Sequence, residues 1–344
     1  MKKLVFLVAL FLVCVSLGSF AIWHYKYHLY SYLPSTPDSM VKNVDGILFG
    51  ADGKAFSGRL KEKTDSGSSV YAYKSGKLSG LNVVFSDGLL REIGHWQNGK
   101  QNGLFAAWTD KSVLIDRGFF KNGERDGETL QYWSDTGKIK LKAHYRAGKL
   151  NGLVEQYDPQ GTLQFKHMYK DHKLHGEAFD YFENGKLKSY VVFDRGLQSG
   201  PFKLYSEDGV LLEEGILKEG MRHGAFTVYS PQTGKPAIKG NYNMNAYDGE
   251  ITMWRADGVK SVQNFDKGVA NGWQKTYNSQ GTLIQKIMLK NGQATGEFYT
   301  YDAKGNLIAK RDPDKTDKIR IREMPSTSDE LSRDNSGIVI IESN

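Results

Sequence analysis

The sequence predicts an all-β chain, an open antiparallel β-meander or solenoid of tandem β-hairpin repeats of about 24 residues, with one hydrophobic helix at the N-terminus. Three observations support this fold class. Short runs alternate apolar with polar residues, which is the period of a strand with one buried face. The runs are separated by turns of the form Gly-x-x-x-Gly. These turns recur at a nearly constant interval through most of the chain.

The repeat unit is clearest at residues 137–158. The apolar members of its first alternating run are Ile139, Leu141, Ala143 and Tyr145. The run ends at a turn that contains Gly148 and Gly152. Glycine suits a tight hairpin because positive φ angles are open to a residue without a Cβ atom. A second run, 153–157, and a turn-forming segment, 158–161, complete a unit of strand, turn, strand and turn.

Three positions keep their register through ten units. The second glycine of each turn recurs every 23 to 25 residues, at Gly80, Gly103, Gly127, Gly152, Gly176, Gly200, Gly224, Gly249, Gly272 and Gly296. An aromatic residue lies five positions after each glycine, which gives an aromatic ladder of Phe85, Trp108, Tyr132, Tyr157, Tyr181, Tyr205, Tyr229, Trp254, Tyr277 and Tyr301. A large apolar anchor, such as Tyr145 or Phe193, lies three positions before each first glycine. A fixed period of this size indicates a repeat architecture.

Some units depart from the pattern. His172 and Asn245 replace the first glycine of the turn, and asparagine tolerates positive φ. Residues 53–58 look like an eroded eleventh unit.

The pattern resembles the MORN-variant repeat, which is found in tandem in bacterial YwqK-type antitoxin proteins. The resemblance rests on blocks such as residues 182–188, Phe-Glu-Asn-Gly-Lys-Leu-Lys, and residues 148–152, Gly-Lys-Leu-Asn-Gly. It covers roughly residues 45–310. It implies an antitoxin-like or protein-interaction role, and repeats of this kind serve many partners.

The charge pattern gives no sign of a nucleic-acid partner. The formal net charge of +7 is modest for 344 residues, and lysines alternate with carboxylates instead of forming blocks. A nucleic-acid footprint would need clustered basic residues, so we interpret these charges as a solvated face. The single cysteine, Cys14, lies in the N-terminal segment, so the rest of the chain has no disulfide and depends on packing for its stability.

Residues 1–23 are expected to form a signal peptide or a transmembrane anchor. Lys2 and Lys3 precede an uncharged run of twenty residues, from Leu4 to Trp23, which is long enough to cross a bilayer as a helix. The lysines favour a cytoplasmic N-terminus. Cleavage is the alternative to anchoring, because residues 19–21 form a small-x-small site. Both readings place the protein in the bacterial cell envelope, anchored in the inner membrane and facing the periplasm or the outside, or secreted to the periplasm.

Residues 24–44 are expected to form a linker, because Pro34 and Pro37 favour an extended spacer. Residues 45–310 form the MORN-variant repeat array. One unit cannot fold alone. Ordering its backbone costs about 1–2 kcal/mol per residue, and burial of its few apolar anchors stabilises it by only about 1.5–3 kcal/mol each. Stacked units bury apolar faces against one another, so the array gains the stabilisation that a single unit lacks.

Residues 311–344 are expected to form a mostly flexible C-terminal tail. The segment 312–314, Asp-Pro-Asp, ends the last unit, and charges of both signs follow it. The apolar segment 337–341 is an exception, and it could add an edge strand or cover exposed apolar surface.

The residues with catalytic or metal-binding chemistry occupy repeat positions. His167, His172 and His175 are close in sequence, and imidazole binds zinc and copper. However, His172 and His175 stand at turn positions where another unit has Gly148 and Asn151, so we interpret them as solvated turn residues.

Four glutamates directly follow turn glycines, and they are Glu128, Glu177, Glu250 and Glu297. Paired carboxylates can perform acid–base catalysis, but residues that recur at the repeat period are usually part of a scaffold. The glycines do not form a phosphate loop, since no helix follows them. The aromatic ladder could stack nucleic-acid bases, but packing in the sheet explains it without a ligand.

The sequence therefore predicts a binding protein, not an enzyme, with no catalytic, cofactor or metal residues. The expected function is a protein-binding repeat scaffold, exported or membrane-anchored, which is an antitoxin or immunity-type protein of a toxin–antitoxin system. The alternatives are a structural cell-envelope spacer and a protein that binds lipid surfaces. The expected partners are another protein and, through residues 1–23, a membrane.

Overall fold

The computed structural model describes residues 26–311, apart from the side chains of residues 295–297 and 311. It confirms the all-β prediction, because nearly all the regular structure in this part of the chain is antiparallel strand. The predicted hydrophobic helix, 1–23, and the tail after residue 311 lie outside the described residues. The chain divides into two compact units, residues 1–173 and residues 174–344, and each is treated separately below.

Within residues 26–311, no helix is both long enough and apolar enough to cross a membrane.

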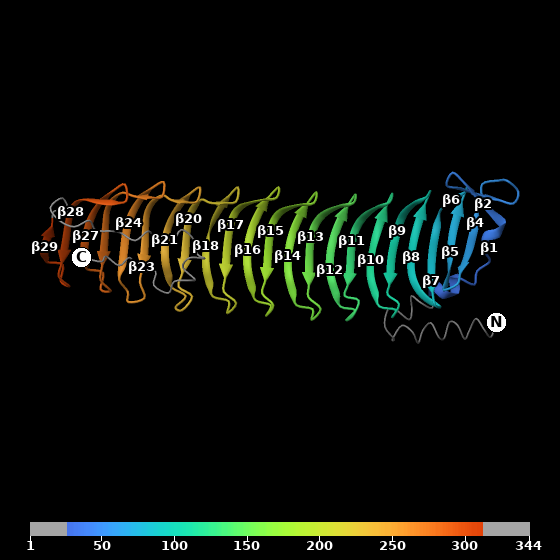
Figure 1. The fold of residues 1–344 in the computed structure, drawn as a ribbon, viewed down its shortest axis with the longest axis horizontal. Helices are drawn as coiled ribbons and strands as arrows, with labels where there is room; N and C mark the ends of the chain where they lie inside the picture. Colours follow the sequence, from blue (N-terminus) through green and yellow to red (C-terminus); the bar gives the residue numbers. More distant parts are fainter. Residues whose placement is uncertain (1–25, 312–344) are drawn as a thin grey trace. The chain divides into compact units, whose positions relative to one another are not determined.

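The first unit contains a helical turn at residues 26–30, a short 3₁₀ helix and a succession of strands (Figure 1). Its elements are β1 (Thr36–Pro37), η1 (Asp38–Met40), β2 (Val41–Val44), β3 (Ile47–Gly50), β4 (Gly58–Thr64), β5 (Gly67–Lys74), β6 (Lys77–Leu78), β7 (Gly80–Ser86), β8 (Leu89–Gln97), β9 (Lys100–Trp108), β10 (Leu114–Lys121), β11 (Glu124–Tyr132), β12 (Ile139–Arg146), β13 (Lys149–Tyr157) and β14 (Leu163–Lys170).

The second unit continues the same succession of hairpins. Its strands are β15 (Lys173–Tyr181), β16 (Leu187–Asp194), β17 (Leu197–Tyr205), β18 (Leu211–Lys218), β19 (Met221–Arg222), β20 (Gly224–Tyr229), β21 (Pro236–Asn243), β22 (Ala246–Tyr247), β23 (Gly249–Trp254), β24 (Lys260–Asp266), β25 (Val269–Ala270), β26 (Gly272–Tyr277), β27 (Leu283–Lys290), β28 (Gln293–Tyr301) and β29 (Leu307–Arg311).

Within each unit the strands pair antiparallel in sequence order, as short turns at both ends of a strand require. The exceptions lie at the start of the first unit, where β1 pairs parallel with β4, and β2 and β3 form a separate hairpin. Apart from these exceptions, the strands of each unit follow an open meander, which agrees with the predicted topology. Side chains directly opposite each other on paired strands share one face of the sheet.

The hairpin turns at the first-glycine end have two residues, and both have positive φ. The first of the two has φ between 47° and 54°, and the second has φ between 66° and 92°. This is the type I′ geometry, which matches the right-handed twist of the flanking strands. His172, with φ of 66°, and Asn245, with φ of 69°, take the glycine conformation. The recurring glycine of the sequence predicts the second turn residue but not the first, which is Asn98, Ala147 or Arg195 in different hairpins.

Each turn is hydrogen-bonded to the hairpin before it. The amide of Gly99 donates to the carbonyl of Leu78, at 2.8 Å. The same bond recurs from Gly123 to Gln101 in the first unit, and from Gly220 to Gln198 in the second, each at 2.8 Å. His172 and Asn245 keep the bond although they replace the glycine. The repeat therefore joins consecutive hairpins through their turns as well as through their strands.

The second glycine of the turn motif has a different conformation, and in several hairpins a neighbouring side chain also lies over it. Nine of the ten predicted turn glycines have φ between 80° and 131°; the surroundings of the tenth, Gly296, are outside the described residues. A Cβ atom added at Gly103 would lie 2.9 Å from the Cβ of His95, and one at Gly200 would lie 3.0 Å from the Cβ of Val192. Gly103 and Gly200 thus meet both a conformational and a steric requirement.

Each unit has its own buried cluster. In the first unit, Val83, Ile93 and Ala106 pack with the ladder residues Phe85 and Trp108. In the second unit the buried residues surround a group of rings, and they are Phe226, Val228, Ile238, Tyr242 and Ile251. The Tyr242 ring lies 4.2 Å from Phe226 and 4.9 Å from Tyr247, so aromatic packing adds to the burial of apolar area.

The segment predicted as a linker packs against the first hairpins. Tyr27 is only 5% exposed and belongs to the first buried cluster. The hydroxyl of Tyr30 donates to the carbonyl of Leu81 at 3.0 Å, and Arg59 Nε donates to the carbonyl of Pro34 at 3.0 Å. Residues 26–44 thus differ from the extended spacer that the prolines suggested, because two tyrosines find apolar surface on strands distant in sequence.

The turn geometry leads to a test with two adjacent substitutions. Gly200→Val should lower the melting temperature more than Ser199→Val. Valine at position 200 would have to adopt a φ of 131°, with its Cβ 3.0 Å from the Cβ of Val192. The backbone strain alone is worth about 1–3 kcal/mol. Thermal unfolding of both variants measures the difference, and equal melting temperatures would contradict the structural role given to Gly200.

Candidate functional site

The clustered histidines have local structural roles. His172 lies in a turn, where its Nδ1 accepts a hydrogen bond from the amide of Leu150 at 3.1 Å, and its own amide donates to the Leu150 carbonyl at 3.0 Å. His167 lies in β14 and stacks on Phe165, with ring centroids 4.4 Å apart. His175, in β15, has its Nδ1 3.3 Å from Asp194 Oδ1. Across residues 26–311, no group of three or more His, Cys, Asp or Glu residues is arranged to hold a metal ion.

Two of the glutamates that follow turn glycines contact side chains on adjacent strands. Glu128 Oε2 lies 3.6 Å from Lys142 Nζ, and Glu177 Oε1 accepts a hydrogen bond from the Tyr190 hydroxyl at 3.1 Å. Glu250 lies opposite Asn264. Glu297 is outside the described side chains. These distances are those of cross-strand pairs on a sheet, and none brings two of the glutamates together.

The aromatic ladder lies at the end of the second strand of each hairpin. Tyr132, Tyr157 and most other members mark the point where the strand register shifts, which is a β-bulge position. Burial raises the pKa of Tyr132. The Tyr229 hydroxyl donates to Glu214 at 2.7 Å, and this bond is the main reason why the pKa of Tyr229 is raised. The ladder therefore forms part of the packed sheet.

Two ion pairs that the sequence pattern did not predict occupy the same two positions of the repeat. In the first unit, Arg125 Nη1 donates to Asp116 Oδ1 at 3.3 Å. In the second unit, Arg222 donates to both oxygens of Glu213 at 2.8 and 2.9 Å, and Glu213 is only 1% exposed. In both pairs the arginine follows the acid by nine residues, a spacing that could have revealed them.

Other hairpins carry different residues at these two positions. One hairpin has Leu141 and Leu150, which need no charge partner. Another has Glu92 and Gln101, and burial raises the pKa of Glu92. The chain thus keeps the backbone of the unit and varies one pair of facing side chains.

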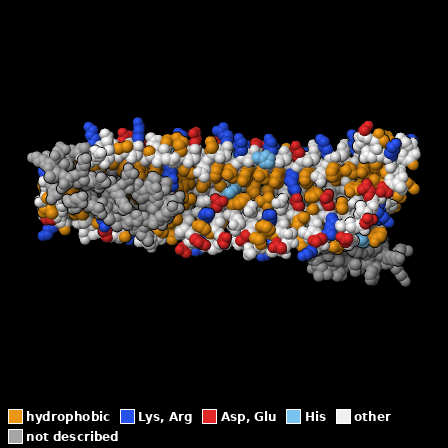
Figure 2. Space-filling model, viewed as in Figure 1, with side chains coloured by type: hydrophobic (Ala, Val, Ile, Leu, Met, Phe, Trp, Pro, Cys, Tyr) orange, Lys and Arg blue, Asp and Glu red, His pale blue; other side chains and the backbone are white. Residues whose placement is uncertain are grey.

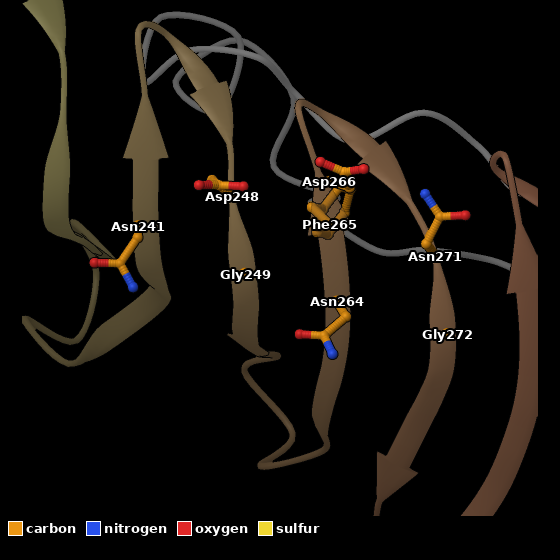
Figure 3. Close-up of a pocket in the computed structure, with 8 residues that line it drawn as sticks. All are labelled: Asn241, Asp248, Gly249, Asn264, Phe265, Asp266, Asn271 and Gly272. Carbon is orange, nitrogen blue, oxygen red and sulfur yellow. The ribbon is translucent and has the colours of Figure 1, made fainter.

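A shallow hollow of about 610 Å³ lies between hairpins of the second unit (Figure 3). The polar side chains around it are Asn241, Asp248, Asn264, Asp266 and Asn271. Asn271 uses its amide within the turns, since its Oδ1 accepts from the Asn291 amide at 2.9 Å and its Nδ2 donates to the Val269 carbonyl at 3.3 Å. The lining holds carboxylate and amide oxygens but no histidine, cysteine or lysine.

The surface offers a more extended feature at the residue before each large apolar anchor. In the first unit this position holds Phe119 and Met168, which are 43% and 38% exposed, with His144 between them. In the second unit Ile216 occupies it and is 45% exposed. Figure 2 shows hydrophobic side chains in a band along the middle of the first unit's strands, with charged side chains nearer the turns. Exposed apolar side chains at a fixed repeat position are typical of a contact surface.

Comparison with known families gives one match. The model of the MORN repeat variant matches residues 150–171 and 174–194, which are two adjacent hairpin units. The likeness therefore identifies the repeat in the middle of the chain. A search of the curated proteins finds none that matches this chain.

The buried ion pair leads to a second test. Arg222→Gln gives the buried Glu213 a glutamine at the partner position, as Glu92 has. A buried acid left without its cation costs about 3–5 kcal/mol. Urea unfolding at pH 7 measures the loss of stability.

A double variant is the control. Glu213→Leu with Arg222→Leu recreates the Leu141–Leu150 combination of another hairpin and should unfold within about 1.5 kcal/mol of the original protein. If Arg222→Gln and the double variant were destabilised equally at pH 7, the ion pair would not be the reason for the cost.

Proposed function

We propose that this chain is a non-catalytic repeat scaffold that binds a protein partner on the surface of its hairpin array. One observation carries the proposal: Phe119 and Met168 stay 43% and 38% exposed at the same position of the repeat, so a large part of each apolar side chain faces solvent. A binding surface built from many units is the usual mode of repeat proteins. The described histidines and glutamates support this function because their contacts are with the backbone or with side chains of the array.

The biological setting is part of the proposal. An antitoxin or immunity role is supported by the likeness of the repeat to the MORN variant, and it requires a toxin as the partner. Export or membrane anchoring is supported by the apolar run between Leu4 and Trp23. If the antitoxin role and the export are both correct, the protein meets its partner outside the cytosol.

The first functional test compares exposed apolar residues. Phe119→Ser combined with Met168→Ser should reduce the protein's cellular effect at least tenfold at matched expression, because a few anchors carry most of the energy of an interface. Leu197→Ser is the matched control, since Leu197 is also exposed but lies at the start of a strand, outside this repeat position. Both proteins should keep their melting temperature within a few degrees.

The same assay separates a scaffold from a catalyst. Single alanine replacements should have mild effects at His167, His172, His175, Glu128, Glu177 and Glu250. Deletion of residues 176–199 removes 24 residues, keeps the register of the repeat and should give a graded loss. A single alanine that abolishes the effect in a folded protein would indicate a catalytic or metal centre.

Export has its own test. Alkaline phosphatase fused after Ser35 should be active, because that reporter requires an oxidising compartment. An inactive fusion that stays in the cytosol would contradict the proposed localisation.

A further inference from the structure

The helical turn at the start of the described chain is held on the first unit by one of its sides. Residues 26–30 are helical, and backbone hydrogen bonds between residues three apart continue the turn to Leu33. Tyr27 and Ser31, one turn apart, are only 5% and 9% exposed. Lys61 Nζ, from β4, donates to the carbonyl of Ser31 at 3.3 Å. The strands of the first unit therefore fix the position of this turn.

The opposite side of the same turn is apolar and exposed. Leu29, Tyr32 and Leu33 are 43%, 73% and 45% exposed, and Tyr32 is the most exposed large apolar side chain among the described residues. Residues at i, i+3 and i+4 of a helical turn lie on one face, so these three side chains form one patch, which we call the outer face. A single exposed leucine is ordinary, but several apolar side chains on one face are typical of a contact surface.

The outer face is close in sequence to the apolar run from Leu4 to Trp23. Leu29 follows Trp23 by six positions, so the Cα atoms of these two residues are at most about 20 Å apart. The apolar run has the length that crosses the hydrocarbon core of a bilayer, and the headgroup region lies directly outside that core. With Trp23 at the end of the core, the chain length alone keeps the outer face within reach of the lipid headgroups.

Basic groups lie around the turn. Lys26 Nζ is 5.4 Å from the centroid of the Tyr27 ring, and Arg59 Nε donates to the carbonyl of Pro34 at 3.0 Å. A helix with one apolar face and basic flanks lies in the plane of a membrane interface, where anionic lipids attract the cations. Asp38, in η1, carries the opposite charge, so the inference depends on the apolar side chains of the outer face and not on net charge.

We propose that Leu29, Tyr32 and Leu33 lie in the headgroup region of the membrane in which residues 1–23 are anchored. The inference rests on the proposed membrane anchoring and adds a second contact with the lipid. A tyrosine between leucines suits this region, because its ring is apolar and its hydroxyl is polar. Since Tyr27 fixes the same turn to the strands, the membrane contact holds the first hairpins at the bilayer surface.

The small size of the outer face favours lipid over a protein as its occupant. A stable protein–protein interface buries about 800 Å² on each partner, which needs many more residues than the three on this turn. A membrane contact beside an anchor needs little affinity of its own, because the anchor keeps the local concentration of lipid high.

The test places a fluorescent label on the full-length chain in a defined membrane. The chain is synthesised in the presence of vesicles of phosphatidylethanolamine and phosphatidylglycerol. Cys14→Ala removes the only cysteine, and Tyr32→Cys then carries the label. Met168→Cys is the control, since Met168 is also exposed in the first unit but lies on β14. Quenching by a nitroxide-bearing lipid should be about threefold stronger at position 32 than at position 168, and quenching by aqueous iodide should be weaker.

Charged substitutions show whether the outer face makes the contact. Leu29→Asp combined with Leu33→Asp should move the label at position 32 into water, because carboxylates oppose burial in the interface. Met40→Asp combined with Val44→Asp makes the same change of charge at two exposed positions outside the turn and should leave the label in lipid. All four positions are exposed, so both double variants should keep their melting temperature within a few degrees.

Three results would overturn the assignment. The first is equal access of iodide to positions 32 and 168 in the vesicles. The second is protection of position 32 from iodide without quenching by the lipid and only at high protein density, which would make a second copy of the chain the occupant. The third is lipid quenching at both positions, which would place the array itself on the bilayer.

Failure of this inference is distinguishable from failure of the proposed export. If the alkaline phosphatase fusion is active and the label at position 32 is in water, export stands and the outer face is not a membrane contact. If the label is in lipid while the fusion is inactive and cytosolic, the contact with lipid stands and the proposed localisation is contradicted.

Discussion

The hydrogen bond between each type I′ turn and the hairpin before it is the interaction on which the array depends. It requires two consecutive residues with positive φ at every turn, which explains why glycine, asparagine and aspartate are frequent there. It also fixes how far each hairpin advances past the last, from Leu78 bonded to Gly99 through Ala270 bonded to Gly292. With that advance fixed, a side chain such as Val192 comes to lie over the next turn glycine, Gly200.

A constant backbone lets the chain vary side chains at single positions without altering the fold. One pair of facing positions holds Glu213 with Arg222 in one hairpin and Leu141 with Leu150 in another. Another pair holds Lys203 with Glu214 and, three units later, Lys275 with Lys286. Both pairs of positions thus accept different side-chain chemistry on the same backbone.

The sequence was sufficient to predict the hairpins, because period-two alternation and glycines at a fixed interval reflect local geometry. Features that depend on contacts between residues distant in sequence were harder to predict from local patterns. Burial of Tyr27 requires strands more than fifty residues away, so composition suggested a linker instead. The Glu213–Arg222 pair was missed because each residue looks like an ordinary surface charge until the strands are paired.

Amide hydrogen exchange tests the central role of the turn bond most directly. The amides of Gly99, Gly123 and Gly220 lie at exposed turns but donate to carbonyls of the preceding hairpin at 2.8 Å. For the preceding amides, Asn98, Asn122 and Glu219, the described residues supply no acceptor. The glycine amides should exchange at least a hundredfold more slowly than the amides before them, as slowly as amides in the strands. Equal exchange rates within each of these pairs would show that the turns are not bonded to their neighbours and would contradict the proposed basis of the array.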